Sequence, residues 1–152
     1  MREIIFRAKV EDKDELIGKG FSIGGTVNPI SKWVYGVPTP ILGYPDLFTA
    51  WNVFNGEYEE LTVITETIGQ YTGLTDKNGT KIFEGDILQY DDGDEYDESE
   101  KAVVVWMDSG FWLEYHNGQT EPWYEQDWGY GNVYFEVIGN IHDNPELLTD
   151  SN

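Results

Sequence analysis

The sequence predicts a mainly β fold, α+β at most, for this chain of 152 residues. Short runs of β-branched and aromatic residues alternate with turn sequences rich in Gly, Asn and Asp, which is typical of strands joined by tight turns. Asn55-Gly56 is a strong hairpin signal, and it lies between two such runs. A chain of this length can bury a core of its own, so we expect a single domain over residues 1–152.

The N-terminal part, residues 1–69, is predicted to contain β-hairpins and a loop region rich in Gly and Pro. Residues 2–10 have the composition of a strand, and Leu16-Ile17 could begin its return strand. Residues 46–54 are compatible with a strand or a single helical turn, because periodicity does not decide over so short a span. A second hairpin is expected around Asn55-Gly56.

Residues 70–148 are predicted to form a barrel-like core, with a small SH3-like barrel or a strongly bent antiparallel sheet over residues 70–142. Asp76-Lys77-Asn78-Gly79 places Asx side chains and a glycine where a tight turn needs local hydrogen bonds and a positive φ. Glu84-Gly85-Asp86 is predicted to form a second turn, and residues 87–90 leave it as a strand. Two turns around a short apolar pair favour a curled sheet.

The C-terminal strands follow from the same reasoning. Residues 101–107 are predicted to be a strand that is buried on both faces, because their apolar run is nearly unbroken. Residues 111–115 would be its partner across Asp108-Ser109-Gly110, a three-residue connection suited to a type I turn followed by a left-handed residue. Residues 134–141 read as the last strand. Asn144-Pro145-Glu146-Leu147-Leu148 predicts one helical turn, with Asn144 as its cap.

Three blocks of the sequence carry a family resemblance. Residues 70–88, the start Met1-Arg2-Glu3-Ile4-Ile5-Phe6-Arg7-Ala8 and the close Val137-Ile138-Gly139-Asn140-Ile141-His142-Asp143-Asn144-Pro145-Glu146-Leu147-Leu148 resemble the YopX family of phage and prophage proteins. The resemblance implies an origin in a phage or prophage of a low-GC Gram-positive bacterium, a β-rich fold, and compatibility with an oligomer. The family is largely uncharacterised, so it implies no catalytic or binding residue.

Charge is the strongest compositional feature, with 29 acidic against 9 basic residues and a formal net charge of −20. Residues 91–152 contain Lys101 as their one Lys or Arg, and they carry a formal net of −15 against −5 for residues 1–90. Binding to a phosphate backbone requires cations, so direct binding of nucleic acid is not expected. Solubility explains the acidity most simply, and the alternative is an acidic surface that imitates a polyanion and docks on a basic host or phage protein.

The densest run of acids spans residues 91–100. Repulsion between like charges predicts a solvated loop here, and the spacing required for a calcium-binding loop is absent. If the acidic half contacts a basic partner, this loop is the candidate surface, with Asp92, Asp94, Glu95, Asp97 and Glu98 as its residues.

Motifs for catalysis or cofactor binding are absent from the sequence. There is no cysteine, which excludes disulfides, thiol nucleophiles and thiolate metal sites. There is no nucleophile elbow or phosphate-binding loop, and His116 and His142 are too far apart in sequence to form a metal motif. His142 is expected to make a local hydrogen bond in a turn. We therefore predict no cofactor, no metal, no catalytic residue and no enzymatic activity.

Carbohydrate binding or cleavage is the one alternative with chemical content. Aromatic faces next to carboxylates can stack on sugars and supply an acid and a base. The candidate aromatic patch is Trp123 and Trp128, with Glu121, Glu125 and Asp127 close in sequence. The simpler explanation is that a β domain needs large aromatic residues for its core.

These observations favour a non-enzymatic accessory protein that acts through protein contacts. Self-association is also expected, because one region is too irregular to bury all of its apolar side chains locally, and exposed apolar patches mark association. These side chains are Trp33, Tyr35, Ile41, Leu42 and Phe48. No apolar run is long enough for a membrane span, and no signal peptide is evident. We expect the cytoplasm of a bacterial host cell as its location.

Overall fold

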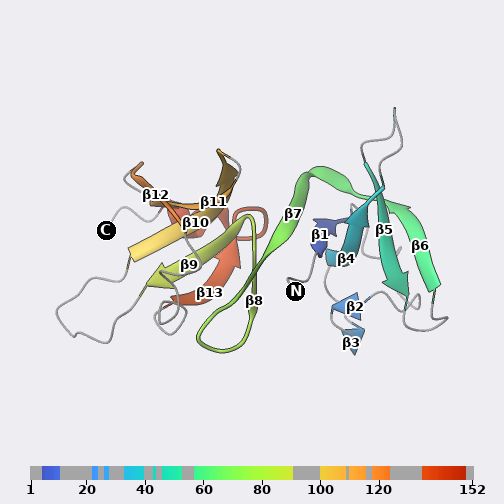
Figure 1. Cartoon of the computed structure of the whole chain (residues 1–152), viewed down its shortest axis with the longest axis horizontal. Coiled ribbons are helices and arrows are strands. Elements are labelled where there is room, and N and C mark those ends of the chain that lie inside the picture. Colours follow the sequence, from blue (N-terminus) through green and yellow to red (C-terminus); the bar gives the residue numbers. More distant parts are fainter. Residues whose placement is uncertain are drawn as a thin grey trace. The chain divides into compact units, whose positions relative to one another are not determined.

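A computed structural model of the chain describes residues 5–10, 22–23, 26–27, 33–39, 43, 46–52, 57–90, 100–108, 110–115, 118–123 and 135–149. The chain forms two compact units, unit 1 over Glu3–Gln70 and unit 2 over Tyr71–Asn152 (Figure 1). Nearly all regular structure in the described part is antiparallel β, which confirms the mainly β prediction. No helix in this part is long and apolar enough to cross a membrane.

Unit 1 is built on an antiparallel sheet in the order β6-β5-β4-β1-β7. A separate ladder of two-residue strands, β2 and β3, belongs to the same unit. The bounds of these strands are β1 Phe6–Lys9, β2 Ser22–Ile23, β3 Thr26–Val27, β4 Trp33–Pro38, β5 Leu47–Asn52, β6 Glu57–Thr62 and β7 Ile64–Thr75.

The hairpin around Asn55-Gly56 is confirmed. Strands β5 and β6 pair in antiparallel register up to Asn52 opposite Glu57, and the connecting residues 53–56 lie outside the described part. Residues 47–52 are therefore a strand and not a helical turn. A hairpin forms here because Asn-Gly favours a tight turn between two strands, and because Phe48 on β5 lies opposite Leu61, the β6 residue that packs against the core.

The predicted N-terminal hairpin is wrong in its partner. Strand β1 pairs with β4 on one edge and with β7 on the other, so no edge of Phe6–Lys9 remains for a return strand at Leu16-Ile17, residues that lie outside the described part. Burial explains the distant pairing. Ala8 on β1 and Val34 on β4 are opposite each other and fully buried in the same core, so this pairing removes two apolar side chains from water together.

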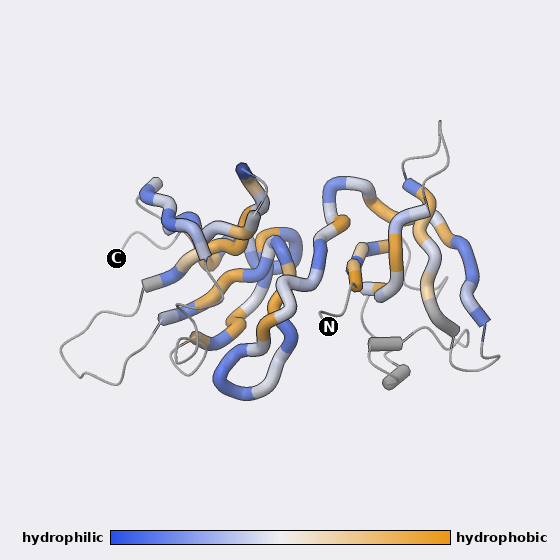
Figure 2. Tube along the Cα trace, in the orientation of Figure 1, coloured by the Kyte–Doolittle hydropathy of each residue, from blue (hydrophilic) through white to orange (hydrophobic). Residues whose placement is uncertain are grey.

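The core of unit 1 gathers the apolar faces of these strands, and its edge strand β6 is hydrophilic along most of its length (Figure 2). Phe48, which we expected at a subunit contact, is fully buried inside this core. Trp33 and Tyr35 are half-buried on β4, and Ile41 and Leu42 lie outside the described part. The chain therefore buries more of this region locally than its irregular sequence indicates. The buried members are Ala8, Val10, Val34, Phe48, Ala50 and Val63.

Unit 2 contains a five-stranded antiparallel sheet in the order β12-β11-β10-β9-β13. Its end strands β12 and β13 do not pair with each other in the described part, so the sheet is open and does not close into a barrel. The C-terminal end of β7 pairs with β8 in the same unit. The bounds are β8 Lys81–Phe83, β9 Asp86–Tyr90, β10 Glu100–Met107, β11 Gly110–Tyr115, β12 Thr120–Pro122, β13 Phe135–Asn140 and the 3-10 helix η4 Pro145–Leu148.

Both turns predicted in residues 70–88 are present. Gly79 has φ 83° and its N–H donates to the Asp76 carbonyl at 3.0 Å, while the Asp76 side chain accepts from Asn78 N–H at 2.8 Å. Gly85 has φ 91°, and Asp86 Oδ2 accepts from Phe83 N–H at 2.8 Å. The positive φ values explain why glycine occupies these two positions.

The connection between β10 and β11 is shorter than predicted. Met107 pairs with Gly110, so the loop holds two residues, Asp108 and Ser109. Asp108, at φ 51°, is the left-handed residue, whereas Gly110 belongs to β11 without a positive φ. Aspartate tolerates this conformation better than most side chains do, and two-residue loops with positive φ match the twist of a hairpin.

The predicted C-terminal helical turn is confirmed as η4, with proline at its start and Glu146 in its first turn. The role predicted for Asn144 is wrong, because its side chain makes no capping hydrogen bond to the helix. Asn144 Oδ1 instead accepts from Asn140 N–H at 3.3 Å, so the side chain fastens the turn that follows β13.

Candidate protein-contact surface

Among the residues of unit 2 that the structure describes, the hairpin of β10 and β11 carries the one large hydrophobic side chain that is exposed, Trp106. Their register places Val104 opposite Leu113, and Trp106 opposite Phe111. Since side chains alternate between faces along a strand, Trp106 and Phe111 are on the same face as the buried pair Val104 and Leu113. The aromatic pair therefore continues the core face of the sheet toward the end of the hairpin.

Trp106 and Phe111 form an edge-to-face pair. Their ring centroids are 4.8 Å apart with an interplanar angle of 79°. Such a pair contributes about 0.5–1.5 kcal/mol beyond the area that it buries. Phe111 packs against the core of unit 2, while Trp106 is 50% exposed. The hairpin thus holds a large indole ring in a defined position and leaves half of its surface to solvent.

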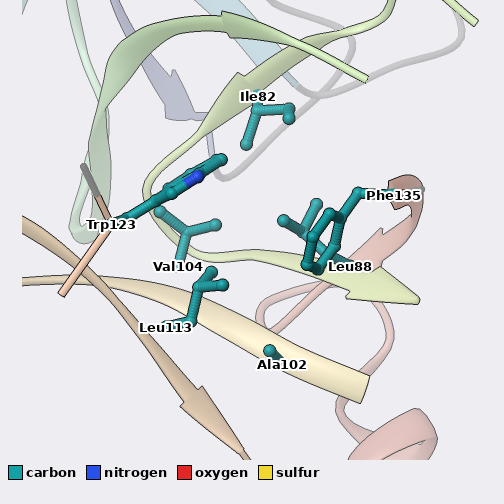
Figure 3. Packing of buried hydrophobic residues seen from close by; sticks show 7 residues of the cluster. All are labelled: Ile82, Leu88, Ala102, Val104, Leu113, Trp123 and Phe135. Carbon is teal, nitrogen blue, oxygen red and sulfur yellow. The ribbon is translucent and has the colours of Figure 1, made fainter. Parts of the chain in front are cut away.

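This aromatic pair is joined to the core of unit 2 through Phe111. The backbone N–H of Trp123 donates to the backbone carbonyl of Phe111 at 3.0 Å, and the Trp123 side chain is 8% exposed. Figure 3 shows the Trp123 indole reaching in toward Ile82 and Val104. Exposure therefore increases from Trp123 through Phe111 to Trp106, so Trp106 is the solvent end of a row of aromatic residues whose other end is core. We call these three residues the aromatic row.

The acidic side chains that surround the hairpin are exposed. Asp108 lies in the loop, and Glu114 and Glu121 lie on β11 and β12. Residues 71–152 carry 19 acidic and 3 basic residues, a formal net of −16, and residues 102–152 contain no Lys or Arg. The row therefore ends in solvent within a strongly negative unit.

Strand β10 meets the prediction of burial on both faces only in part. Ala102, Val103 and Val104 are buried, but the exposed Trp106 ends the buried stretch. An apolar run predicts burial, and this run gave no sign that its last aromatic residue is exposed. Sequence reasoning therefore missed Trp106.

Trp123 does not form the exposed aromatic patch that the sequence suggested. A ring that is 8% exposed and packed among Ile82, Val104 and Leu113 has no free face for stacking on a sugar. Trp128 lies outside the described part. Of the neighbouring acids, Glu121 is exposed and its Oε1 accepts from the Tyr115 hydroxyl at 2.7 Å, while Glu125 and Asp127 lie outside the described part.

The candidate residues of the acidic run lie outside the described part; these are Asp92, Asp94, Glu95, Asp97 and Glu98. The strands that precede and follow it, β9 and β10, pair in antiparallel register with Glu100 opposite Tyr90.

The buried carboxylates of unit 2 have structural partners. Asp76 accepts hydrogen bonds from Asn78, Thr80 and Val137 N–H, and Asp86 accepts from Phe83 N–H. No group of His, Cys, Asp and Glu side chains within the described ranges could hold a metal ion.

His142 lies in the turn after β13, half-buried. Its backbone N–H donates to Asn140 Oδ1 at 3.0 Å, the local bonding expected of a turn residue. Gly85 is its neighbour, since a Cβ built there would lie 3.5 Å from His142 Nε2. His116 lies outside the described part.

These features define an all-β protein of antiparallel sheets with an aromatic, acidic hairpin. The chain belongs to the YopX family, because the family model described as YopX protein matches residues 47–149. The crystal structure of protein EF1440 from Enterococcus faecalis is similar to it, with 27% sequence identity, coverage of 97% of this chain and 99% of that chain, and a TM-score of 0.49. No curated protein matches the chain significantly.

Proposed function

We propose that this YopX protein is a non-enzymatic phage or prophage accessory protein that acts through protein–protein contacts in the cytoplasm of its bacterial host. The observation that carries the proposal is the half-exposed indole of Trp106, held edge-to-face on Phe111 at 4.8 Å. Tryptophan is enriched among the residues that dominate binding energy at protein interfaces. A rigidly held, exposed ring loses little conformational entropy when a partner covers it.

The test is affinity capture from host lysate with the tagged full-length chain and its Trp106→Ala variant in parallel, followed by mass spectrometry. A partner protein recovered by the wild-type chain and depleted at least fivefold with the variant supports the proposal. Tyr58→Ala is the matched control, because Tyr58 is an aromatic residue of unit 1 that is even more exposed than Trp106, at 65% against 50%. Identical protein recovery with wild type and Trp106→Ala would contradict it.

A second candidate function is an acidic inhibitor that imitates a polyanion and occupies the basic surface of a nucleic-acid-binding protein. The formal net of −16 in residues 71–152 favours it, because a field of one sign steers basic partners toward the protein. Its test replaces Asp92, Asp94, Glu95, Asp97 and Glu98 together by Asn or Gln. The variant should remain folded and lose a salt-sensitive basic partner, and unchanged capture would remove the idea.

Self-association and an SH3-like arrangement of unit 2 are parts of the same proposal. Self-association is supported by Trp33 and Tyr35 on β4, which are only half-buried. The SH3-like arrangement is supported by the five short antiparallel strands of unit 2. Light scattering on the purified chain tests self-association, since a monomeric mass over the accessible concentration range would contradict it. An experimental structure of the full chain tests the SH3-like strand order.

A further inference from the structure

Two aromatic rings of the chain make cation–π contacts with its own basic side chains. In unit 1 the Trp33 ring has the Arg7 guanidinium 4.6 Å from its centroid and the Lys9 ammonium 6.0 Å away. In unit 2 the Tyr71 ring has the Lys81 ammonium 5.0 Å from its centroid. Cations within about 6 Å of an aromatic face are attracted by the quadrupole of the ring. Two rings of this protein are thus occupied by its own scarce cations.

Trp106 has a different neighbour. Its ring contact is Phe111, at an interplanar angle of 79°, and half of its surface is exposed. Tryptophan has the best aromatic face for a cation. Residues 102–152 include no Lys or Arg, and Lys101, the one such residue in the hairpin, lies at the start of β10, five positions before Trp106.

The negative charge around the hairpin determines which kind of partner can bind the exposed indole. A second copy that docked through this hairpin would bring two strongly acidic units together, so like charges oppose self-association at this surface. Nucleic acid and anionic lipid are repelled for the same reason. A cationic segment is attracted by the field of unit 2, and Asp108 lies exposed in the loop two residues after Trp106.

We propose that Trp106, the exposed end of the aromatic row, is the docking site for a basic segment of a partner protein, in which an Arg or Lys side chain stacks on the exposed face of Trp106 while a second cation pairs with Asp108. This inference rests on the proposed function and names the chemistry of the partner. Arginine fits best, because its planar guanidinium stacks on indole and is weakly hydrated. Phe111 and Trp123 act as positioning residues that keep the indole in place.

The test titrates the full-length chain with a fluorescently labelled peptide of alternating Arg and Gly, measured by anisotropy at 50 and 200 mM salt. The Trp106→Ala variant should bind about tenfold more weakly at both salt concentrations, which corresponds to a cation–π contribution of about 1–2 kcal/mol. Trp106→Phe should lose less, because it keeps an aromatic face. A matched peptide with citrulline in place of Arg has the same shape without the charge, and it should not bind.

A structural readout separates stacking from general attraction by charge. In nitrogen–proton correlation spectra, the indole N–H resonance that Trp106→Ala removes should shift on addition of the Arg peptide. Glu146→Gln, an exposed acid on η4, is the control for charge alone and should bind within about twofold of wild type. Equal binding by wild type and Trp106→Ala would overturn the inference, as would a Trp106-dependent dimer in light scattering.

The proposed function and this inference fail in different ways. A captured partner that depends on Trp106 but binds through an acidic or uncharged segment would overturn the cationic inference and leave the protein-contact function standing. If the wild-type chain captures no partner that depends on Trp106 and does not bind the Arg peptide, both proposals are contradicted.

Discussion

The carboxylate of Asp76 joins the turn between β7 and β8 to β13. Asp76 Oδ2 accepts from Val137 N–H at 2.9 Å across 61 positions of sequence. Oδ1 accepts from Asn78 N–H at 2.8 Å and from Thr80 N–H at 2.9 Å, and the residue is 3% exposed. One side chain thus shapes a local turn and fixes the last strand beside it. Hydrogen bonds to an ionised, buried acceptor are the strong class.

Replacing Asp76 should therefore destabilise unit 2 more than replacing any exposed acid. Asp76→Asn turns one acceptor into an amide N–H₂ that faces a backbone donor, and we expect the free energy of unfolding to fall by about 2–4 kcal/mol. Urea denaturation followed by tryptophan fluorescence measures the change. Glu114→Gln, at an exposed position, should stay within about 0.5 kcal/mol of wild type. Equal stability of Asp76→Asn and wild type would refute the role given to this carboxylate.

Thr67 has a comparable role in unit 1. Its hydroxyl donates to the Ile64 carbonyl at 2.6 Å and accepts from Lys9 N–H at 2.8 Å, at the place where the β1–β7 register shifts. Thr67→Val keeps the shape and removes both hydrogen bonds, so it should cost about 1–3 kcal/mol. Thr67→Ser retains the hydroxyl and should cost less. If chemical denaturation finds valine as stable as serine here, the hydroxyl does not hold the strands.

Gly36 allows β4 to approach β5 closely. A Cβ at this position would overlap the Thr49 carbonyl oxygen and come within 2.9 Å of Ala50 Cα. Both obstacles are backbone atoms, so Gly36→Ala should separate the two strands and lower the midpoint of thermal unfolding by at least about 10 °C. Gly110→Ala is the control, because nothing lies within 4 Å of its added methyl group. Similar melting temperatures for the two variants would contradict the close approach.

Gly79 isolates the cost of backbone conformation. Its φ is 83°, and an added Cβ would meet nothing within 4 Å, so any loss on substitution comes from backbone strain. Gly79→Ala should destabilise by about 1–2 kcal/mol, and Gly79→Asn by less, because Asn tolerates a left-handed backbone. Urea denaturation of both variants gives the comparison. A loss for Asn that equals or exceeds that for Ala would show that the turn restricts side chains by another means.

Substitutions of Trp106 and Trp123 should differ in their effect on stability, because Trp106 is exposed and Trp123 is part of the core. Trp123→Ala removes a core ring and should cost about 3–5 kcal/mol, whereas Trp106→Ala loses little more than an edge-to-face contact worth about 0.5–1.5 kcal/mol. Thermal and urea unfolding of the two variants test this directly. A Trp106→Ala protein that unfolds as readily as Trp123→Ala would mean that the exposed ring is structural, and the contact function would lose its support.

Local structure was predictable where its hydrogen bonds are local. The Asp76–Gly79 turn follows from residue types because Asp76 binds Asn78 and Thr80 within four positions. The β5–β6 hairpin follows in the same way from Asn55-Gly56 and its flanking runs. The bond from Asp76 to Val137 has no such signature, because nothing in either segment records that the other will lie beside it.

The strand order and the exposure of the aromatic residues could not be predicted from the sequence, for a related reason. The partner of β1 depends on which distant apolar residues share a core with Ala8. Val34 on β4 does so, and β1 therefore pairs with β4 and not with the segment that follows it in sequence. Trp106 ends an apolar run and is exposed, while Trp123 stands among polar residues and is buried. Each is the reverse of what its neighbours indicate, because burial depends on contacts made across strands. The candidate site was therefore missed, although its acidic surroundings were expected.

Strand β7 is shared by both units: it pairs with β1 in unit 1 at Phe6 opposite Gln70, and with β8 in unit 2 at Tyr71 opposite Phe83. The family match begins at residue 47, which retains β5, β6 and β7 but omits β1 and β4, the strands that lie between β5 and β7 in the sheet. A fragment trimmed to the matched residues would expose the inner edges of β5 and β7 and would be prone to aggregate. The segment by which the family is recognised thus omits two central strands of the unit 1 sheet, and truncations for expression should retain the chain from β1 onward.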